Sequence, residues 1–291
     1  MSETNLTTIK KIADFFFTKI LIGLLVVGGL VAFAEWALRP LLASAQLSIY
    51  VQDLIVGITE ALLALFSYVL LFQWYEKRRI RELSTGFLWK EAALGFLTGL
   101  SLQSLFILVI YGAADYSVIR VNPASFLLPA FTTALTAGFV AEIMIRGIAF
   151  RLIEEKMGTA ITLVIFALLF AALHAGKNAT ILSVLSTAIQ AGVLLSSSYI
   201  LTRRLWFPIF LHFAWDFAEP GIYGGINPGN SVGLSLFTSK ISGPQFLTGG
   251  QLGPQNSLQS VIGCLAVSLL FLWIAKRRNN FIKPSWKNKL Q

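Results

Sequence analysis

Apolar runs of membrane-spanning length occupy most of this 291-residue chain and constrain its fold more than any other feature. A helix needs about 20 mostly apolar residues to cross a bilayer. Hydrophobic residues make up 56% of the chain and charged residues 13%, about half the usual charged share of a soluble domain. The candidate spans are Phe17–Leu38, Ile49–Trp74, Leu88–Tyr111, Phe126–Ile153, Thr159–His174, Ala179–Leu201, Trp206–Ala218 and Leu258–Ala275. The sequence therefore predicts an all-α, polytopic membrane protein, residues 1–291 forming one domain with about eight transmembrane helices.

The basic residues predict how these spans are oriented. Most lysines and arginines fall in alternate connections, and only Arg39, Arg120, Lys177 and Lys240 fall in the others. The positive-inside rule then places both termini, and a basic tail at 276–291, in the cytoplasm. The net charge of +9 is scattered between apolar segments, so no nucleic-acid partner is expected, whereas membrane lipid is.

Two charged residues stand inside the fourth span, in the stretch from Gly138 to Gly147. Glu142 and Arg146 are four residues apart, so on a helix they share a face and can pair. Ionisable residues at such depth are costly and indicate a functional site by default. A buried salt bridge that only fixes helix packing explains this pair equally well. Glu35 and Arg39 have the same spacing near the end of the first span, where we expect an interfacial pair.

The next span places a histidine opposite this glutamate. If Gly158 is the turn of a helical hairpin, Glu142 precedes it by 16 residues and His174 follows it by 16. With equal rise per residue, both side chains lie about 24 Å from the turn. A carboxylate and an imidazole can therefore meet inside the membrane, although an interfacial histidine fits His174 as well.

The only other histidine, His212, lies four residues before Asp216 in the seventh span, on one helix face. A glutamate and a histidine that share a water can hydrolyse a bond, and a second histidine can stabilise an oxyanion. A local hydrogen bond between His212 and Asp216 is the simpler alternative. On this topology His212 lies only about 9 Å from the cytoplasmic end of its helix, shallower than Glu142.

The connection from Glu219 to Asn256 is rich in glycine and proline. Loops longer than about 15 residues without secondary structure are usually functional lids or disordered linkers. Its position after His212 and Asp216 favours a cap over the site, and a plain surface connection is the alternative.

Three patterns on three separate spans together resemble the CPBP family of CAAX proteases and bacteriocin-processing enzymes, also called the Abi family. They are Glu142-x-x-x-Arg146, Phe170-x-x-x-His174 and His212-x-x-x-Asp216. The resemblance covers about 132–254, including Ser242-Gly-Pro and Thr248-Gly-Gly. It implies an eight-helix intramembrane fold and a glutamate-type endopeptidase of a prokaryotic plasma membrane, acting on a peptide or protein reached from the bilayer. It further implies that His174 positions the hydrolytic water, that His212 and Asp216 bind the oxyanion, and that Arg146 holds Glu142.

The sequence departs from that family at one position. The family has two adjacent glutamates, of which the first activates water, and here the first is Ala141. An alanine accepts no proton, and its neighbour on a helix points about 100° away. Ala141 is thus an engineered inactivation, a natural loss of activity, or a site whose role Glu142 has taken over.

Three functions follow as hypotheses. The first is an endopeptidase with catalysis impaired at Ala141, and the second is a scaffold or bacteriocin-immunity-type protein on the same fold. The third is a transporter, which predicts repeated halves that the sequence does not show. No cofactor is expected, but two histidines and one glutamate meet the usual zinc-ligand count, so a metal-dependent variant stays open.

Overall fold

Helices form nearly all of the computed structural model, which describes residues 15–286 except 178 and 225–233. The helices are α2 (Phe16–Ser44), α3 (Ile49–Tyr75), α4 (Leu88–Ala113), α5 (Leu128–Thr136), α6 (Arg151–Met157), α7 (Thr159–His174), α8 (Ile181–Thr187), α9 (Leu195–Thr202), α10 (Trp206–Phe217), α11 (Gln245–Thr248) and α12 (Leu258–Arg277). Between α5 and α6, and between α8 and α9, π-helical segments continue the helix without a break. The predicted all-α membrane class is therefore confirmed.

The number of spans is less definite than the class. In the described part of the chain, six helical segments are long and apolar enough to cross a membrane. They are Phe16–Ser44, Ile49–Tyr75, Thr85–Ala113, Ala124–Met157, Ile181–Thr202 and Leu258–Arg277. The other two expected spans are the shorter helices α7, of 16 residues, and α10, of 12 residues. The count of eight thus stays a prediction.

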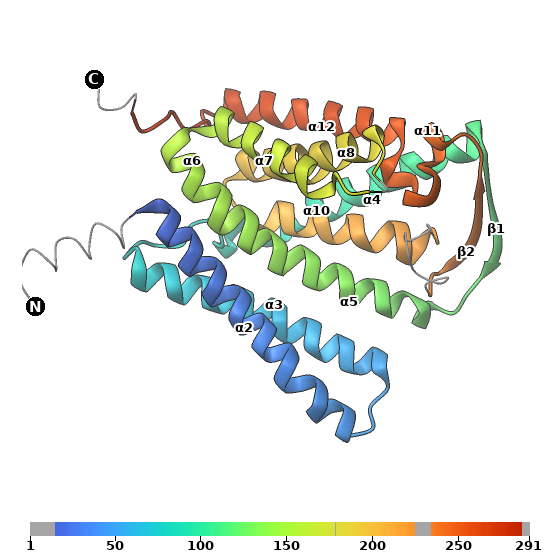
Figure 1. Cartoon of the computed structure of the whole chain (residues 1–291), viewed down its shortest axis with the longest axis horizontal. Coiled ribbons are helices and arrows are strands. Elements are labelled where there is room, and N and C mark those ends of the chain that lie inside the picture. Colours follow the sequence, from blue (N-terminus) through green and yellow to red (C-terminus); the bar gives the residue numbers. More distant parts are fainter. Residues whose placement is uncertain (1–14, 178, 225–233, 287–291) are drawn as a thin grey trace, which may run out of the picture.

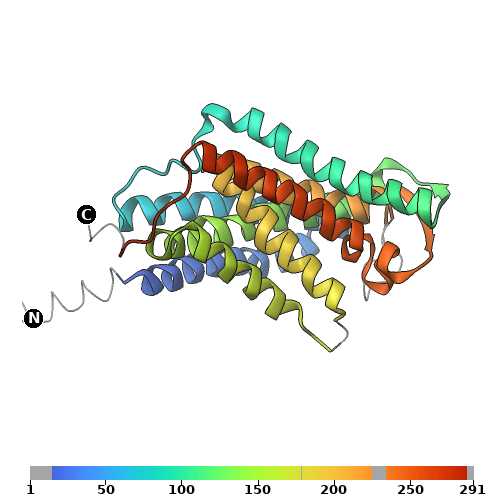
Figure 2. The same ribbon diagram turned by 90° about the horizontal axis from the view of Figure 1, so that it is seen from above.

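Helix α10 lies in the middle of the bundle, where it packs against α4 and α5 (Figure 1). Helices α2 and α3 form a hairpin that contacts α5 from one side. On the other side α12 packs against α4, α9 and the π-helical segment before α9 (Figure 2). This arrangement encloses α10 with helices that shield a segment too short to span alone.

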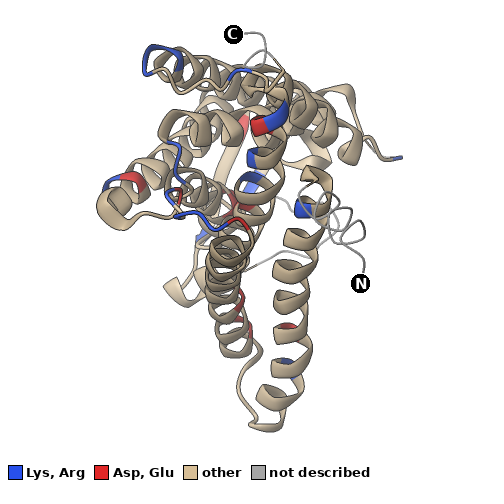
Figure 3. Cartoon of the chain, turned by 90° about the vertical axis from the view of Figure 1, so that its left-hand side faces the viewer, with Lys and Arg blue, Asp and Glu red and all other residues tan. Residues whose placement is uncertain are grey.

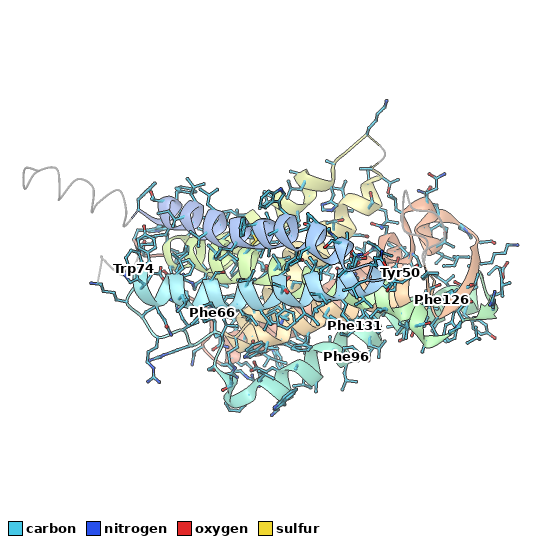
Figure 4. All side chains as sticks on the ribbon, turned by 90° about the horizontal axis from the view of Figure 1, so that it is seen from below. Tyr50, Phe66, Trp74, Phe96, Phe126 and Phe131 are labelled. Atoms are coloured by element: carbon cyan, nitrogen blue, oxygen red, sulfur yellow. The ribbon has the colours of Figure 1, made fainter. Side chains whose placement is uncertain are left out.

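Large apolar side chains cover the outer surface of the bundle. On α3, Phe66 is 63% exposed and Trp74 79% exposed, and Figure 4 labels both among the aromatic residues of this side. The buried apolar residues form two clusters, one around Tyr68 and Phe150 and one around Phe106 and Trp215. Apolar residues exposed on this scale suit a surface that faces lipid.

A two-stranded antiparallel sheet stands at one end of the bundle (Figure 1). Strand β1 (Asp115–Val121) pairs with β2 (Phe237–Ser242), with Asp115 opposite Ser242 and Val121 opposite Phe237. The expectation that 219–256 is an unstructured loop is therefore wrong at both ends of its described part: the π-helical segment Ala218–Ile222 continues α10, and the second half holds β2 and α11. The β-branched residues of β1 suit a strand. Part of the loop, 225–233, lies outside the described residues.

The opposite end of the bundle carries the polar connections (Figures 1 and 3). Lys and Arg lie along its connecting segments and helix ends (Figure 3). At the α6–α7 turn, Gly158 has φ +79°, and a Cβ there would come within 2.8 Å of Pro284. The turn expected at Gly158 is thus present. The predicted basic tail packs beside it, since Thr159 N–H donates to the Ile282 carbonyl (3.0 Å), while 287–291 lie outside the described residues.

Candidate active site

The segment that carries Glu142 is wound more widely than an α-helix. Residues Ala137–Ala141 and Ile143–Phe150 are π-helical and join α5 to α6. Such segments are rare and often occur at functional sites. Neighbouring residues here have opposite surroundings, because Ala141 is half-buried and lines a cavity, whereas Glu142 is 0% exposed. The sequence carries no clear signal for this winding.

One carboxylate oxygen of Glu142 contacts two side-chain nitrogens, one from an arginine and one from a histidine. Its Oε1 lies 2.7 Å from Arg146 Nη1 and 2.8 Å from His212 Nδ1. Arg146 is also 0% exposed, donates from Nη2 to the Ala191 carbonyl, and lies over the Phe170 ring, 5.5 Å from its centroid. The structure therefore places Arg146 as the partner of Glu142, and both residues face into the bundle.

The other ring nitrogen of His212 faces Asp216. His212 Nε2 lies 3.3 Å from Asp216 Oδ2, on the next turn of α10. Ionised carboxylates only accept hydrogen bonds, so His212 hydrogen-bonds to both Glu142 and Asp216 when both of its ring nitrogens carry a hydrogen. Four of the predicted residues thus form a chain of contacts, from Arg146 through Glu142 and His212 to Asp216.

The depth mismatch expected between His212 and Glu142 is wrong, since the two are in contact. Helix α10 begins inside the bundle: Leu205 is 0% and Trp206 8% exposed. The connection before α4 folds inward to meet it, with Leu205 N–H donating to the Glu82 carbonyl (2.8 Å). Counting residues from the connection therefore underestimates how deep His212 lies.

His174 belongs to the same cavity but not to this chain of contacts. It ends α7, is exposed, and its Nδ1 lies 3.1 Å from the Phe170 carbonyl. His174, His212 and Asp216 line one cavity of about 560 Å³, together with Ala141. The structure thus brings the six predicted positions to one site: four in direct contact, and Ala141 and His174 at the cavity wall.

The cavity also contains residues that the sequence reasoning did not select. Thr187 and Gln190 line it from α8 and the π-helical segment that follows, and Gln255 and Asn256 line it from the end of the glycine-rich loop. An amide such as Gln190 inside an apolar span was the available signal. Within the described residues no three His, Cys, Asp or Glu side chains come together as a metal site.

Comparison with known proteins agrees with this geometry. A family model described as "Type II CAAX prenyl endopeptidase Rce1-like" matches residues 123–218. That segment contains every predicted site residue, from Ala141 to Asp216. The resemblance predicted from the sequence is thereby confirmed for residues 123–218, which are similar to the Rce1-like CAAX protease family, and together with the apolar helices this match indicates a membrane endopeptidase fold. Neither the curated proteins nor the solved structures gave a match to the chain.

Proposed function

We propose that the chain is a glutamate-type intramembrane endopeptidase in fold and site, with catalysis impaired because Ala141 stands where the water-activating carboxylate is needed. The observation that carries this is the contrast between two neighbours: Ala141 lines the cavity, while Glu142 is fully buried. With Oε1 bound to Arg146 and His212, Glu142 is poorly placed to take over as the base.

The remaining side chains suit hydrolysis of a peptide bond. A carboxylate at position 141 would take a proton from a cavity water, and the hydroxide would add to the substrate carbonyl. His212 would donate to the oxyanion, and the proton would pass to the leaving amine as the C–N bond breaks. For this, the Asp216 carboxylate must turn away from His212 Nε2. The 3.3 Å contact and the 33% exposure of the Asp216 side chain favour such a turn.

The test is a peptide-cleavage assay in detergent on the parent chain, Ala141→Glu and Ala141→Gln. A general base contributes about 10²–10⁴-fold, so Ala141→Glu should raise turnover by roughly that factor. Ala141→Gln should not, because an amide has the size of Glu but takes no proton. The new carboxylate has room, since Ala141 already borders a cavity.

Two results would argue for other functions. If Ala141→Glu folds yet cleaves no better than Ala141→Gln across a broad peptide library, the missing-base account fails. The scaffold or immunity-type function then takes its place. If activity in the parent follows added divalent metal, the metal-dependent variant is correct instead.

A further inference from the structure

Gln255 is held in the cavity wall by three separate elements. It lies in the helical turn Pro254–Asn256 at the end of the glycine-rich loop. Its backbone N–H donates to Glu219 Oε2 (3.0 Å), and its carbonyl accepts from Gln190 Nε2 (2.6 Å). Its side-chain Oε1 accepts from Trp215 Nε1 (3.2 Å). A side chain fixed in this way loses little conformational entropy when it binds a ligand.

These hydrogen bonds leave one polar atom unused on each of two side-chain amides, those of Gln190 and Gln255. Trp215 occupies Gln255 Oε1, so the Nε2 donors of Gln255 remain. Gln190 Nε2 donates to the Gln255 carbonyl and to Ser260 Oγ, 2.6 Å each, so Gln190 Oε1 remains as an acceptor. No hydrogen bond between described residues uses either remaining atom, and neither atom is buried without a partner. Both residues line the cavity, which therefore offers one amide donor and one amide acceptor.

The rest of the cavity wall suits an uncharged ligand. Asp216 is the one Asp, Glu, Lys or Arg among its described lining residues, and it already contacts His212. Apolar side chains such as Ile145, Phe170 and Leu211 cover much of the remainder. A charged side chain in this space would lose its hydration without gaining a free partner.

We propose that Gln190 and Gln255 bind one peptide group of the substrate main chain, in a segment whose side chains here are uncharged. Gln255 Nε2 donates to the substrate carbonyl, and Gln190 Oε1 accepts from a substrate N–H. Glu219 and Trp215 are positioning residues that hold Gln255 in place. The inference rests on the proposed function, because it supplies the substrate class of that same site.

The experiment measures binding and does not depend on cleavage. The parent chain in detergent is titrated into fluorescent, end-blocked, uncharged hexapeptides, with empty micelles subtracted. Gln255→Glu keeps an oxygen for Trp215 but replaces the donor with an acceptor, and Gln255→Met removes the donor without adding charge. Gln251→Glu is the matched control, since Gln251 is exposed and outside this cavity.

We expect Gln255→Glu to weaken binding about tenfold or more, because the substrate carbonyl then faces a carboxylate. Gln255→Met should weaken hexapeptide binding about fivefold, and Gln251→Glu should bind the hexapeptides as the parent does. In the tightest peptide, replacing amides by esters one at a time removes single N–H donors. One of these replacements should weaken binding to the parent, at the group that meets Gln190 Oε1.

Three results would overturn the inference: both Gln255 variants bind like the parent while keeping its melting temperature, no ester replacement matters, or no hexapeptide binds the parent. The proposed function fails separately. If peptide binding depends on Gln255 yet Ala141→Glu cleaves nothing, the chain binds peptides without being a peptidase.

Discussion

Two buried polar clusters in this molecule differ in which of their buried polar atoms have partners. The site cluster consists of Glu142, Arg146, His212 and Asp216, in the middle of the bundle beside the cavity. The loop-end cluster consists of Tyr68, Glu76, Arg78, Glu82 and Arg151, where the α3–α4 connection packs against the bundle. Both pair cationic or polar side chains with carboxylates, yet they differ in which buried polar atoms lack a partner.

In the loop-end cluster both oxygens of Glu82 have partners. Arg78 lies 2.5 Å from Oε1 and 2.9 Å from Oε2, and Tyr68 OH also donates to Oε1. The Arg78 side chain is 27% exposed, so its guanidinium is accessible to water. Arg151 Nη2 is buried without a hydrogen bond, but it lies 3.0 Å from Glu76 Oε2. In the site cluster, Glu142 Oε2 and Arg146 Nε are fully buried and have no hydrogen-bond partner among the described residues.

Buried polar atoms without partners are rare and lower stability, so each needs an explanation. The loop-end cluster fits a structural role, since its bonds hold a connection in place. The site cluster retains its unsatisfied atoms beside a cavity, as expected where binding or catalysis sets the arrangement. The two clusters therefore differ in their buried atoms without hydrogen bonds: the one in the loop-end cluster still faces a carboxylate, whereas the two in the site cluster lie beside the cavity without a partner among the described residues.

The largest effect is expected from breaking the site cluster on one side only. Arg146→Met leaves Glu142 buried, with His212 as its one remaining partner among the residues that the structure describes. Removing one member of a buried ion pair costs about 3–5 kcal/mol. At about 2–4 °C per kcal/mol, the melting temperature in detergent should fall by about ten degrees.

The matched control removes both charges, as Glu142→Gln with Arg146→Met. Gln keeps an oxygen for His212, so this double variant should regain much of the lost melting temperature. If the double variant melts no higher than Arg146→Met, an uncompensated buried charge is not the cause of the loss.

A smaller effect is expected at the loop-end cluster. Glu82→Gln removes the negative charge and one of the two oxygens that Arg78 contacts, and water can partly replace them because Arg78 is 27% exposed. We expect a loss of about 1–2 kcal/mol, measured as a lower melting temperature. Hexapeptide binding in the cavity should not change. A loss of binding equal to that of Gln255→Glu would contradict the separation of the two clusters.

Acid should weaken the loop-end cluster through the same carboxylate. Burial pushes the pKa of Glu82 upward, but the hydrogen bonds and charge of Arg78 outweigh it and hold the pKa below its ordinary 4.5. The unfolded chain therefore binds the proton more readily, and Glu82 stabilises the fold fully above pH 4.5. That contribution is lost as the pH falls below 4.5 through the folded pKa.

The measurement is the melting temperature of the parent and of Glu82→Gln at several pH values on both sides of 4.5. The difference between them should shrink as the pH falls, since protonated Glu82 resembles the glutamine. A constant difference in melting temperature across that range would show that protonation of Glu82 does not change the stability of the fold.

Much of this architecture could be predicted from the sequence, because hydrophobic runs and i,i+4 spacing depend on local geometry. Helices α3, α4, α7, α10 and α12 begin at the residues where the apolar runs predict them. The contact between Glu142 and Arg146 also follows from spacing. Which of Ala141 and Glu142 faces the cavity does not, since this depends on the π-helical winding and on how α10 packs.

The strand pair and the cavity wall needed long-range information. Strand β1 finds its partner more than a hundred residues later, at β2, so no local pattern fixes the pairing. Gln255 likewise enters the site because Glu219, Gln190 and Trp215 hold it there. Contacts between distant segments decide such features, and a single sequence does not reveal them.

The smallest effect is expected where the sequence repeats the Glu-x-x-x-Arg spacing of the site. Glu35 Oε1 lies 3.2 Å from Arg39 Nε near the end of α2, but these side chains are 51% and 40% exposed. Arg39 also lies 2.6 Å from Asp53, so removing Glu35 leaves it paired. Exposed i,i+4 pairs contribute about 0.3–0.5 kcal/mol, and Glu35→Gln should lower the melting temperature by no more than about 2 °C. The value to compare with it is the melting temperature of Arg146→Met, where the pair has the same spacing but both partners are 0% exposed. A comparable loss in both variants would mean that spacing, and not burial beside the cavity, sets the strength of such pairs in this protein.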